Sequence, residues 1–190
     1  MNSEKLAKIL SVLLGLHFWF PAFLIIGLLK SGLSNTSIFI LAPILFLLQI
    51  VIPIAYIHIS LHFKKISAWD MPKKEERIFF LSMSMIAYLF SMIIIYLFGN
   101  QLLFNLWLIV FILLTAIIVT TYFWQISLHT ALNTAGSIIV NFLFNWSVPW
   151  LYLSVPIIFW ARFKLKRHNT TQLLAGSIIS GAITLGMLKP

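Results

Sequence analysis

Long apolar runs without charge constrain this chain more than any other feature. No Asp, Glu, Lys or Arg occurs between Ile9 and Leu29, and comparable runs recur towards the C-terminus. A helix needs about 20 apolar residues to cross the hydrocarbon core of a bilayer. Only 9% of the 190 residues are charged, whereas soluble domains carry about 25%. The sequence therefore predicts an all-α, polytopic transmembrane helical bundle, with residues 1–190 forming a single membrane domain.

The apolar runs predict spans at 8–29, 37–63, 78–98, 103–124, 131–146, 149–162 and 170–187. The fifth and sixth are short and meet at the sequence NWSVP, residues 145–149. They can form a hairpin that does not fully cross, so six and seven spans are both open. The first run is too long for a signal-peptide core and no small-residue cleavage pattern closes it, so we expect it to be retained.

Basic residues gather on one predicted membrane face. With seven spans, that face holds Lys5, Lys8, Lys64, Lys65, Lys73, Lys74, Arg77, Arg162, Lys164, Lys166 and Arg167, and the other holds Lys30 and Lys189. The positive-inside rule makes the basic face cytoplasmic. The net charge of +9 then reflects topology and anionic lipid rather than nucleic acid. We expect an integral membrane protein of a bacterial inner membrane, anchored at the interfaces by Trp107, Trp124, Trp146, Trp150 and Trp160.

Three polar segments share the basic face, and the first is SAWDMPKKEERIFF, residues 67–80. Asp70 and Pro72 predict the start of a helix with acidic residues in its early turns. Lys74 and Arg77 are three apart, so they can share a helical face. A phosphate clamp is one interpretation, because the Arg fork matches phosphate oxygens. A solvated loop with Glu–Lys pairs is the other.

The second segment is WQISLHTALNTAGS, residues 124–137. It opens a stripe of polar residues spaced four apart: His129, Asn133, Ser137, Asn141 and Asn145. Polar side chains at membrane depth normally face the protein interior, where they bond neighbouring helices. We expect this of Asn141 and Asn145. His129 differs because it lies at the basic face, where an imidazole can exchange protons near neutral pH.

The third segment is RFKLKRHNTTQ, residues 162–172, immediately before the last span. Asn169 followed three residues later by Gln172 predicts a helix-capping box. Alternatively, the Gln172 amide oxygen accepts a hydrogen bond from His168 and orients its ring. The other cations of the segment are expected to contact lipid headgroups: Lys164, Lys166 and Arg167.

Together these segments resemble the type 2 phosphatidic acid phosphatases, in particular a short bacterial branch. Arg162, five residues, His168, three residues, Gln172 resembles the third motif of that family, which ends in Asp. Ser127-Leu128-His129 is similar to its Pro-Ser-Gly-His motif, and residues 70–77 resemble a divergent first motif. The resemblance covers about residues 64–186.

The resemblance implies hydrolysis of a lipid or isoprenoid mono- or diphosphate without metal or cofactor. His168 would attack phosphorus and form a phosphohistidine, and His129 would protonate the leaving oxygen and then activate water. Gln172 would orient His168. The residues implied to hold the phosphoryl oxygens are Arg162, Arg77, Lys74 and Ser127.

The chain departs from the family pattern at Gln172, where the family has Asp. A neutral amide can orient His168 but cannot stabilise an imidazolium by charge. This departure motivates a second hypothesis, a non-catalytic lipid-phosphate-binding protein or scaffold with a degenerate site. A transporter would need ionisable residues at mid-membrane, where the spans offer little besides His17.

His58 and His62 are four apart on the second span, a spacing that can bind a metal. No Cys, Asp or Glu lies beside them in the sequence to complete such a site. We therefore expect hydrogen bonding or pocket lining, and no metal.

Overall fold

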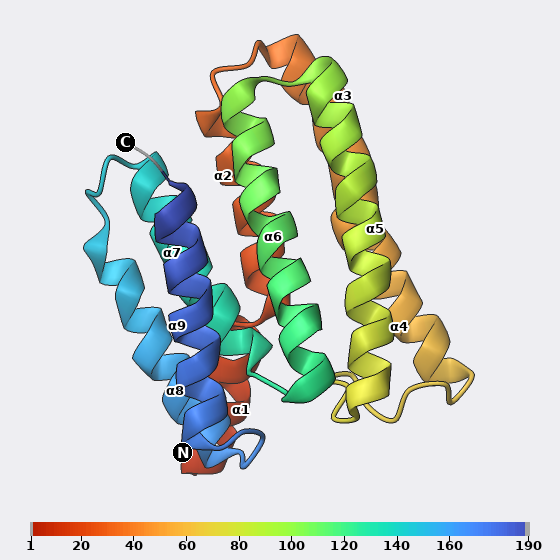
Figure 1. Ribbon diagram of the computed structural model, residues 1–190, viewed down its shortest axis with the longest axis vertical. Helices are drawn as coiled ribbons and strands as arrows, with labels where there is room; N and C mark the ends of the chain where they lie inside the picture. The colour runs from red at the N-terminus through yellow and green to blue at the C-terminus, as the bar shows by residue number, and fades with distance from the viewer. Residues whose placement is uncertain (1, 189–190) are drawn as a thin grey trace. The chain divides into compact units, whose positions relative to one another are not determined.

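The computed structural model describes residues 2–188, and the side chains of all of these except Leu16 and His17. Every regular element among them is helical (Figure 1). Five helical stretches are long and apolar enough to cross a membrane: Ser3–Lys30, Asn35–His62, Lys74–Phe98, Gln101–Phe123 and Thr170–Met187. The protein is therefore an all-α integral membrane protein. The predicted spans at 131–146 and 149–162 correspond to the shorter helices α7 (Leu128–Leu143) and α8 (Ser154–Lys164).

The chain forms two compact units. The terminal unit comprises residues up to Phe23 together with residues from Gln125 onward, and the central unit comprises Leu24–Trp124. Helix α2 (Leu16–Lys30) begins in the terminal unit and ends in the central one. Most of the predicted site residues lie in the terminal unit.

The terminal unit consists of α1 (Ser3–Leu13), α7, the short 3₁₀ helix η2 (Pro149–Leu153), α8 and α9 (Thr170–Met187). Helix α1 packs on α8 around Ala7, Ile158 and Ala161, all of which are fully buried. Helices α7 and α9 make the closest pair. Gly176 lets them approach, because a Cβ there would lie 2.6 Å from the Ser127 carbonyl oxygen.

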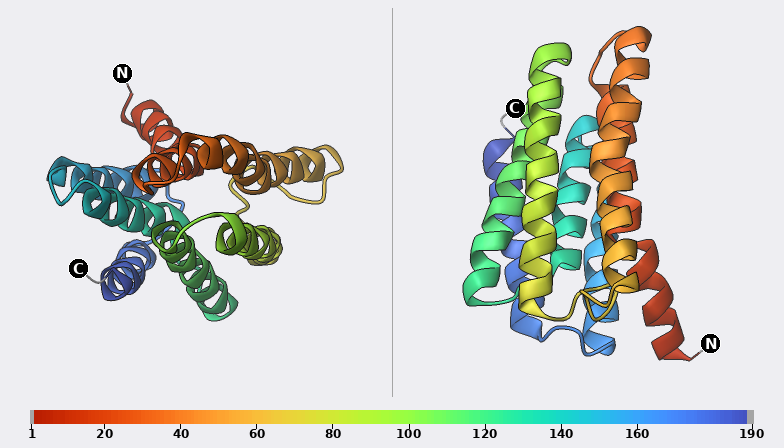
Figure 2. Two further views of the ribbon diagram at one scale, coloured as in Figure 1. Left: turned by 90° about the horizontal axis from the view of Figure 1, so that it is seen from above. Right: turned by 90° about the vertical axis from the view of Figure 1, so that its right-hand side faces the viewer.

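The N-terminal ends of α1, α7 and α9 lie at the same end of the terminal unit (Figure 1). Thr130 donates to Leu173 O (3.0 Å) and Thr134 lies beside Gly181, so α7 and α9 run parallel. Helix α8 follows α7 as the returning arm of a hairpin, and Figures 1 and 2 show the N-terminal end of α1 at the same end of the unit as the α8–α9 connection. We call this the basic end, because it carries Lys5, Lys8, Arg162, Lys164, Lys166 and Arg167.

The first predicted span is interrupted at Leu14 and Gly15, between α1 and α2. The Asn133 side chain donates from Nδ2 to Leu14 O (2.7 Å), which satisfies a carbonyl that the break exposes. Beyond the break, the Trp19 ring packs on Gly136, where any Cβ would collide with it. The predicted span at 8–29 lies within the long apolar stretch Ser3–Lys30, and bonds to α7 favour the break inside it.

Ser137 and Asn141, the next residues of the predicted stripe, also have specific partners. Ser137 donates to Leu151 O (3.0 Å), which joins α7 to η2. Asn141 Oδ1 accepts from Val148 N (3.0 Å) and so closes the loop after α7 instead of bridging to another long helix. Asn145 lies beyond the end of α7 in a left-handed conformation (φ 51°). The predicted stripe of polar residues on one helix face is therefore confirmed from His129 to Asn141 and does not extend to Asn145.

The central unit contains α3 (Asn35–Phe46), η1 (Leu47–Val51), α4 (Ile52–His62), α5 (Lys74–Phe98) and α6 (Gln101–Phe123). Helices α5 and α6 form a hairpin that turns at Gly99 and Asn100 (Figure 1). Trp107 is fully buried and packs beside Gly27, so its predicted role as an interface anchor is wrong. The other four tryptophans named above are between 40% and 64% exposed.

Element η1 is a π-helical turn that joins α3 to α4. Ile52 N donates to Leu47 O, five residues back, which is the wide hydrogen bond of a π-turn. Pro53 follows, and it has no N–H to donate. Gln49 within the turn is 3% exposed, and neither atom of its amide has a hydrogen-bond partner among residues 2–188.

Candidate anion site at the basic end

The N-terminal ends of α7 and α9 lie side by side at the basic end. Ser127 caps α7, since its Oγ accepts from Thr130 N (3.4 Å), and Asn169 caps α9 by accepting from Gln172 N (2.9 Å). The two ends are joined directly, because Ser127 N donates to Gln172 O (3.2 Å). Helix N-termini present N–H groups and a partial positive charge. Their pairing favours a negatively charged ligand here.

His168 is buried (9% exposed) and lies against Gln172. Its Nδ1 is 3.2 Å from Gln172 Oε1, and the same oxygen accepts from Asn169 N (3.1 Å). A backbone N–H is only a donor, so the amide must present its oxygen here. Nδ1 therefore carries the proton and donates to that oxygen, which leaves the lone pair of a neutral His168 on Nε2. The capping box and the contact that orients His168 are both present.

His129 lies in the first turn of α7, against the break in the first span. A Cβ built on Gly15 would lie 3.5 Å from His129 Nε2. The amide of Asn133 donates both to His129 O (2.8 Å) and to Leu14 O (2.7 Å). Asn133 therefore ties the turn that carries His129 to the break.

Arg162 lies in the last turn of α8 with its side chain buried (4% exposed). Its Nη1 donates to Ser11 Oγ (3.0 Å) on α1, and Ser11 is itself 7% exposed. The connection to His168 is compact, since Arg167 N donates to Arg162 O (3.1 Å). Arg162 thus lies at the basic end but not on its surface.

Lys74 and Arg77 lie in the central unit, where each donates to backbone carbonyls. Lys74 Nζ donates to Tyr122 O in the last turn of α6, where carbonyls lack helical partners. Arg77 is 7% exposed and its Nη2 lies 3.4 Å from Met71 O. Both cations therefore stabilise the start of α5.

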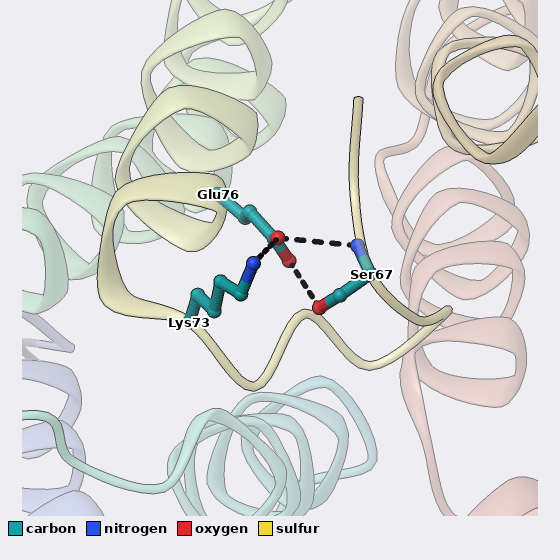
Figure 3. Close-up of polar contacts among 3 residues, drawn as sticks. All are labelled: Ser67, Lys73 and Glu76. Atoms are coloured by element: carbon teal, nitrogen blue, oxygen red, sulfur yellow. Dashed lines mark hydrogen bonds and ion pairs between the residues drawn. The ribbon is translucent and has the colours of Figure 1, made fainter. Parts of the chain in front are cut away.

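Helix α5 begins at Lys74 rather than at Asp70, as Figure 3 explains. The Glu76 carboxylate accepts from Ser67 N (3.1 Å) and Ser67 Oγ (2.9 Å), and Lys73 Nζ lies 3.6 Å away. These contacts fold residues 67–73 back onto the helix as a loop, with Met71 in a left-handed conformation (φ 42°). The predicted start was therefore several residues early, although the acidic first turn is confirmed.

The terminal unit carries most of the predicted site at its basic end: His129, His168, Gln172, Arg162 and Ser127. Lys74 and Arg77 belong to the central unit. Two residues that sequence reasoning missed contact this set, Ser11 and Gly15. Nothing in the sequence distinguishes them, because each is a small residue inside an apolar run.

The other histidines have aromatic neighbours. The His58 ring lies edge-on to Trp69 with centroids 5.0 Å apart, and the His62 ring is edge-on to Phe63 at 5.1 Å. Within residues 2–188 no three His, Cys, Asp or Glu side chains are grouped so that they could hold a metal. The His17 side chain and Lys189 lie outside the described residues.

Comparison of the chain with protein-family models, with curated proteins and with solved structures finds no match.

Proposed function

We propose that the protein is a membrane phosphatase that hydrolyses a lipid or isoprenoid mono- or diphosphate at the basic end of the terminal unit. The observation that carries this proposal is the contact of His168 with Gln172. It puts the proton on Nδ1 and the nucleophilic lone pair on Nε2 of a buried imidazole. The motif resemblance over residues 64–186 supplies the reaction class.

The proposed reaction has two steps. The His168 Nε2 lone pair attacks phosphorus while the bond from phosphorus to the lipid oxygen breaks, and His129 donates a proton to that oxygen. A water molecule then attacks the phosphohistidine, His129 takes the water's proton, and the P–N bond breaks to release inorganic phosphate. Each proton and each electron pair has a named destination, so the protein needs no external reactant except water.

Several groups would hold the phosphoryl oxygens. Arg162 is a buried forked donor, and the Ser127 hydroxyl can donate its proton while its oxygen caps α7. The N-terminal ends of α7 and α9 add partial positive charge. Lys74 and Arg77, which the resemblance also implies as ligands, lie in the central unit. The apolar tail would lie among helices, and we favour an isoprenoid chain because the polar loops are too short to recognise an elaborate headgroup.

The membrane topology belongs to the same proposal. Seven crossings would need α7 and α8 to span the bilayer although each is shorter than 18 residues. A re-entrant hairpin of α7 and α8 would leave five crossings, one for each long apolar helical stretch among residues 2–188. In the seven-span topology the basic end faces the cytoplasm of a bacterial cell by the positive-inside rule.

A non-catalytic lipid-phosphate binder is the second candidate. Gln172 favours it, because a neutral amide offers no charge to stabilise the imidazolium that chemistry at His168 would form. Such a protein would use the same basic end to hold a headgroup without turnover.

Phosphate release from purified protein in EDTA tests the first candidate against the second. The substrates would be phosphatidic acid, phosphatidylglycerol phosphate, and prenyl mono- and diphosphates, with His168→Ala as the control. Loss of a nucleophile typically lowers kcat by a factor of about 10³ or more. Release that survives EDTA and disappears in the variant supports the phosphatase. No release above the variant from folded protein leaves the binder as the function.

A further inference from the structure

Helix α1 lies outside the region of resemblance, yet it contacts two residues of the proposed site. Ser11 accepts from Arg162 Nη1 (3.0 Å), and Gly15 lies against His129 Nε2, which a Cβ at position 15 would approach to 3.5 Å. Ser11 and Gly15 are one helical turn apart. The single turn from Ser11 to Gly15 therefore contacts both the Arg162 guanidinium and the His129 imidazole.

Helix α1 is held firmly enough to fix this arrangement. Ala7 packs with Ile158 and Ala161 in a fully buried cluster, so α1 cannot shift along α8 without opening a cavity. At the other end of α1, Asn133 Nδ2 binds Leu14 O (2.7 Å). Ser11 lies between these two attachments.

The Ser11 contact determines how the Arg162 guanidinium is oriented. The guanidinium is planar and rigid, with five N–H donors whose directions are fixed relative to one another. Once Nη1 is bound to Ser11 Oγ, the other donors have defined directions as well. A buried Arg without this bond would keep its charge but lose the alignment that a phosphate requires.

We propose that α1 completes the phosphate site, with Ser11 as the positioning residue that aligns Arg162 beside His129. The inference rests on the proposed function for the identity of the ligand, a phosphoryl group. It adds a contribution from a segment that the motif resemblance does not include. Ser11 acts through Arg162, so it is not itself a catalytic residue.

Binding of inorganic phosphate to the full-length protein in detergent tests this proposal without requiring turnover. Titration calorimetry would compare wild type with Ser11→Ala and Arg162→Ala. We expect Ser11→Ala to weaken binding about tenfold, the loss expected for one charge-assisted hydrogen bond. The double variant should bind no more weakly than Arg162→Ala alone, because Ser11 acts through that side chain.

A matched pair of variants separates the hydroxyl from packing. Ser11→Thr and Ser11→Val have the same shape, so Thr should retain phosphate binding and Val should weaken it about as much as Ser11→Ala does. Ser180→Ala is the control, since Ser180 is 1% exposed in the same unit and its hydroxyl bonds carbonyls of its own helix. That variant should bind phosphate as wild type does.

The outcomes distinguish this inference from the proposed function. If Arg162→Ala loses phosphate while Ser11→Ala and Ser11→Val bind normally, the role of α1 is wrong and the phosphate site stands. If wild type binds no phosphate, or Arg162→Ala binds it normally, the proposed site is wrong and this inference fails with it.

Discussion

The residue on which the proposed chemistry depends most is Gln172. Its amide oxygen accepts both from Asn169 N and from His168 Nδ1, so the orientation of the amide is fixed by a backbone donor. The imidazole is thereby held in one tautomer without a charge beside it. This arrangement separates orientation from electrostatic activation, two effects that a carboxylate would supply together.

Substitution Gln172→Glu should increase the rate of phosphate release. Glu has the same length, it is the usual partner in a capping box, and its carboxylate can accept both hydrogen bonds. A charged acceptor roughly doubles the strength of the bond to Nδ1–H, so we expect kcat to rise about tenfold. Steady-state kinetics on the best substrate measures this. An equal or lower kcat from stably folded protein would show that the neutral amide does not limit turnover.

Gln49 lowers the stability of the central unit. Burying an amide without hydrogen bonds costs about 1–3 kcal/mol, and both of its polar atoms lack partners within residues 2–188. Gln49→Met, which keeps the length of the side chain, should therefore raise the Tm in detergent. Gln101→Met is the control, because Gln101 is exposed on α6. A lower Tm for Gln49→Met would mean that the amide binds water or lipid in the membrane.

The sequence predicted contacts between residues close in the chain better than distant ones. The Asn169–Gln172 box and the contact of Gln172 with His168 span three and four residues, and local helix geometry dictates both. Ser11 and Arg162 are 151 residues apart, and the Asn133–Leu14 bond spans 119. Such contacts depend on which helices pack together, which the apolar pattern of a membrane protein does not specify, since lipid-facing and buried positions look alike.

At the level of elements, the α7–α9 pair depends on Gly176. A Cβ at this position would lie 2.5 Å from Thr130 Oγ1 and 2.6 Å from Ser127 O, and neither neighbour is the far end of a flexible side chain. Gly176→Ala should therefore push the helices apart. It would also strain the hydrogen bond from Thr130 to Leu173.

We expect Gly176→Ala to destabilise the protein by about 1–3 kcal/mol, the usual cost of overpacking. Thermal unfolding in detergent measures the change. Gly186→Ala on the same helix is the matched control, because a Cβ there meets nothing within 4 Å. Its Tm should stay the same or rise slightly, since Ala has the higher helix propensity. Equal Tm values for the two variants would contradict the close approach of α7 and α9.

Helix boundaries could be predicted where a capping residue marks the start of a helix. Helix α9 occupies 170–187 as predicted, because Asn169 caps its start, and α6 starts two residues before the prediction, after the Asn100 cap. The break at Gly15 was missed, since a single glycine in an apolar run also fits a continuous membrane helix. What breaks the span is the Asn133 side chain, which belongs to another helix.

At the scale of the whole molecule, the unequal distribution of basic residues predicts which side of the membrane the basic end faces. The chain has no cysteine, so single cysteines report position without background. Thr36→Cys and Thr170→Cys put cysteines at exposed positions that are predicted to lie on opposite faces of the membrane. Neither substitution changes a charge. A membrane-impermeant thiol reagent applied to intact cells should label Thr36→Cys.

The same reagent should label Thr170→Cys only after the membrane is permeabilised, because the basic end is expected in the cytoplasm. Permeabilised cells provide the control that both cysteines are reactive. The reverse pattern would place the basic end outside. Labelling of both cysteines in intact cells would put them on one face and contradict the seven-span topology.

The π-turn before Pro53 sets the rotational phase of the long helical stretch Asn35–His62. Five of its buried positions follow one another at intervals of four: Leu41, Leu45, Gln49, Pro53 and Ile57. In a regular helix, a step of four residues overshoots a full turn by about 40°, so this series would drift by roughly 160° around the axis. The extra residue of the π-turn reduces this drift by about 100°. Deleting one residue there would yield an ordinary helix, but its second half would turn a different set of side chains towards the lipid.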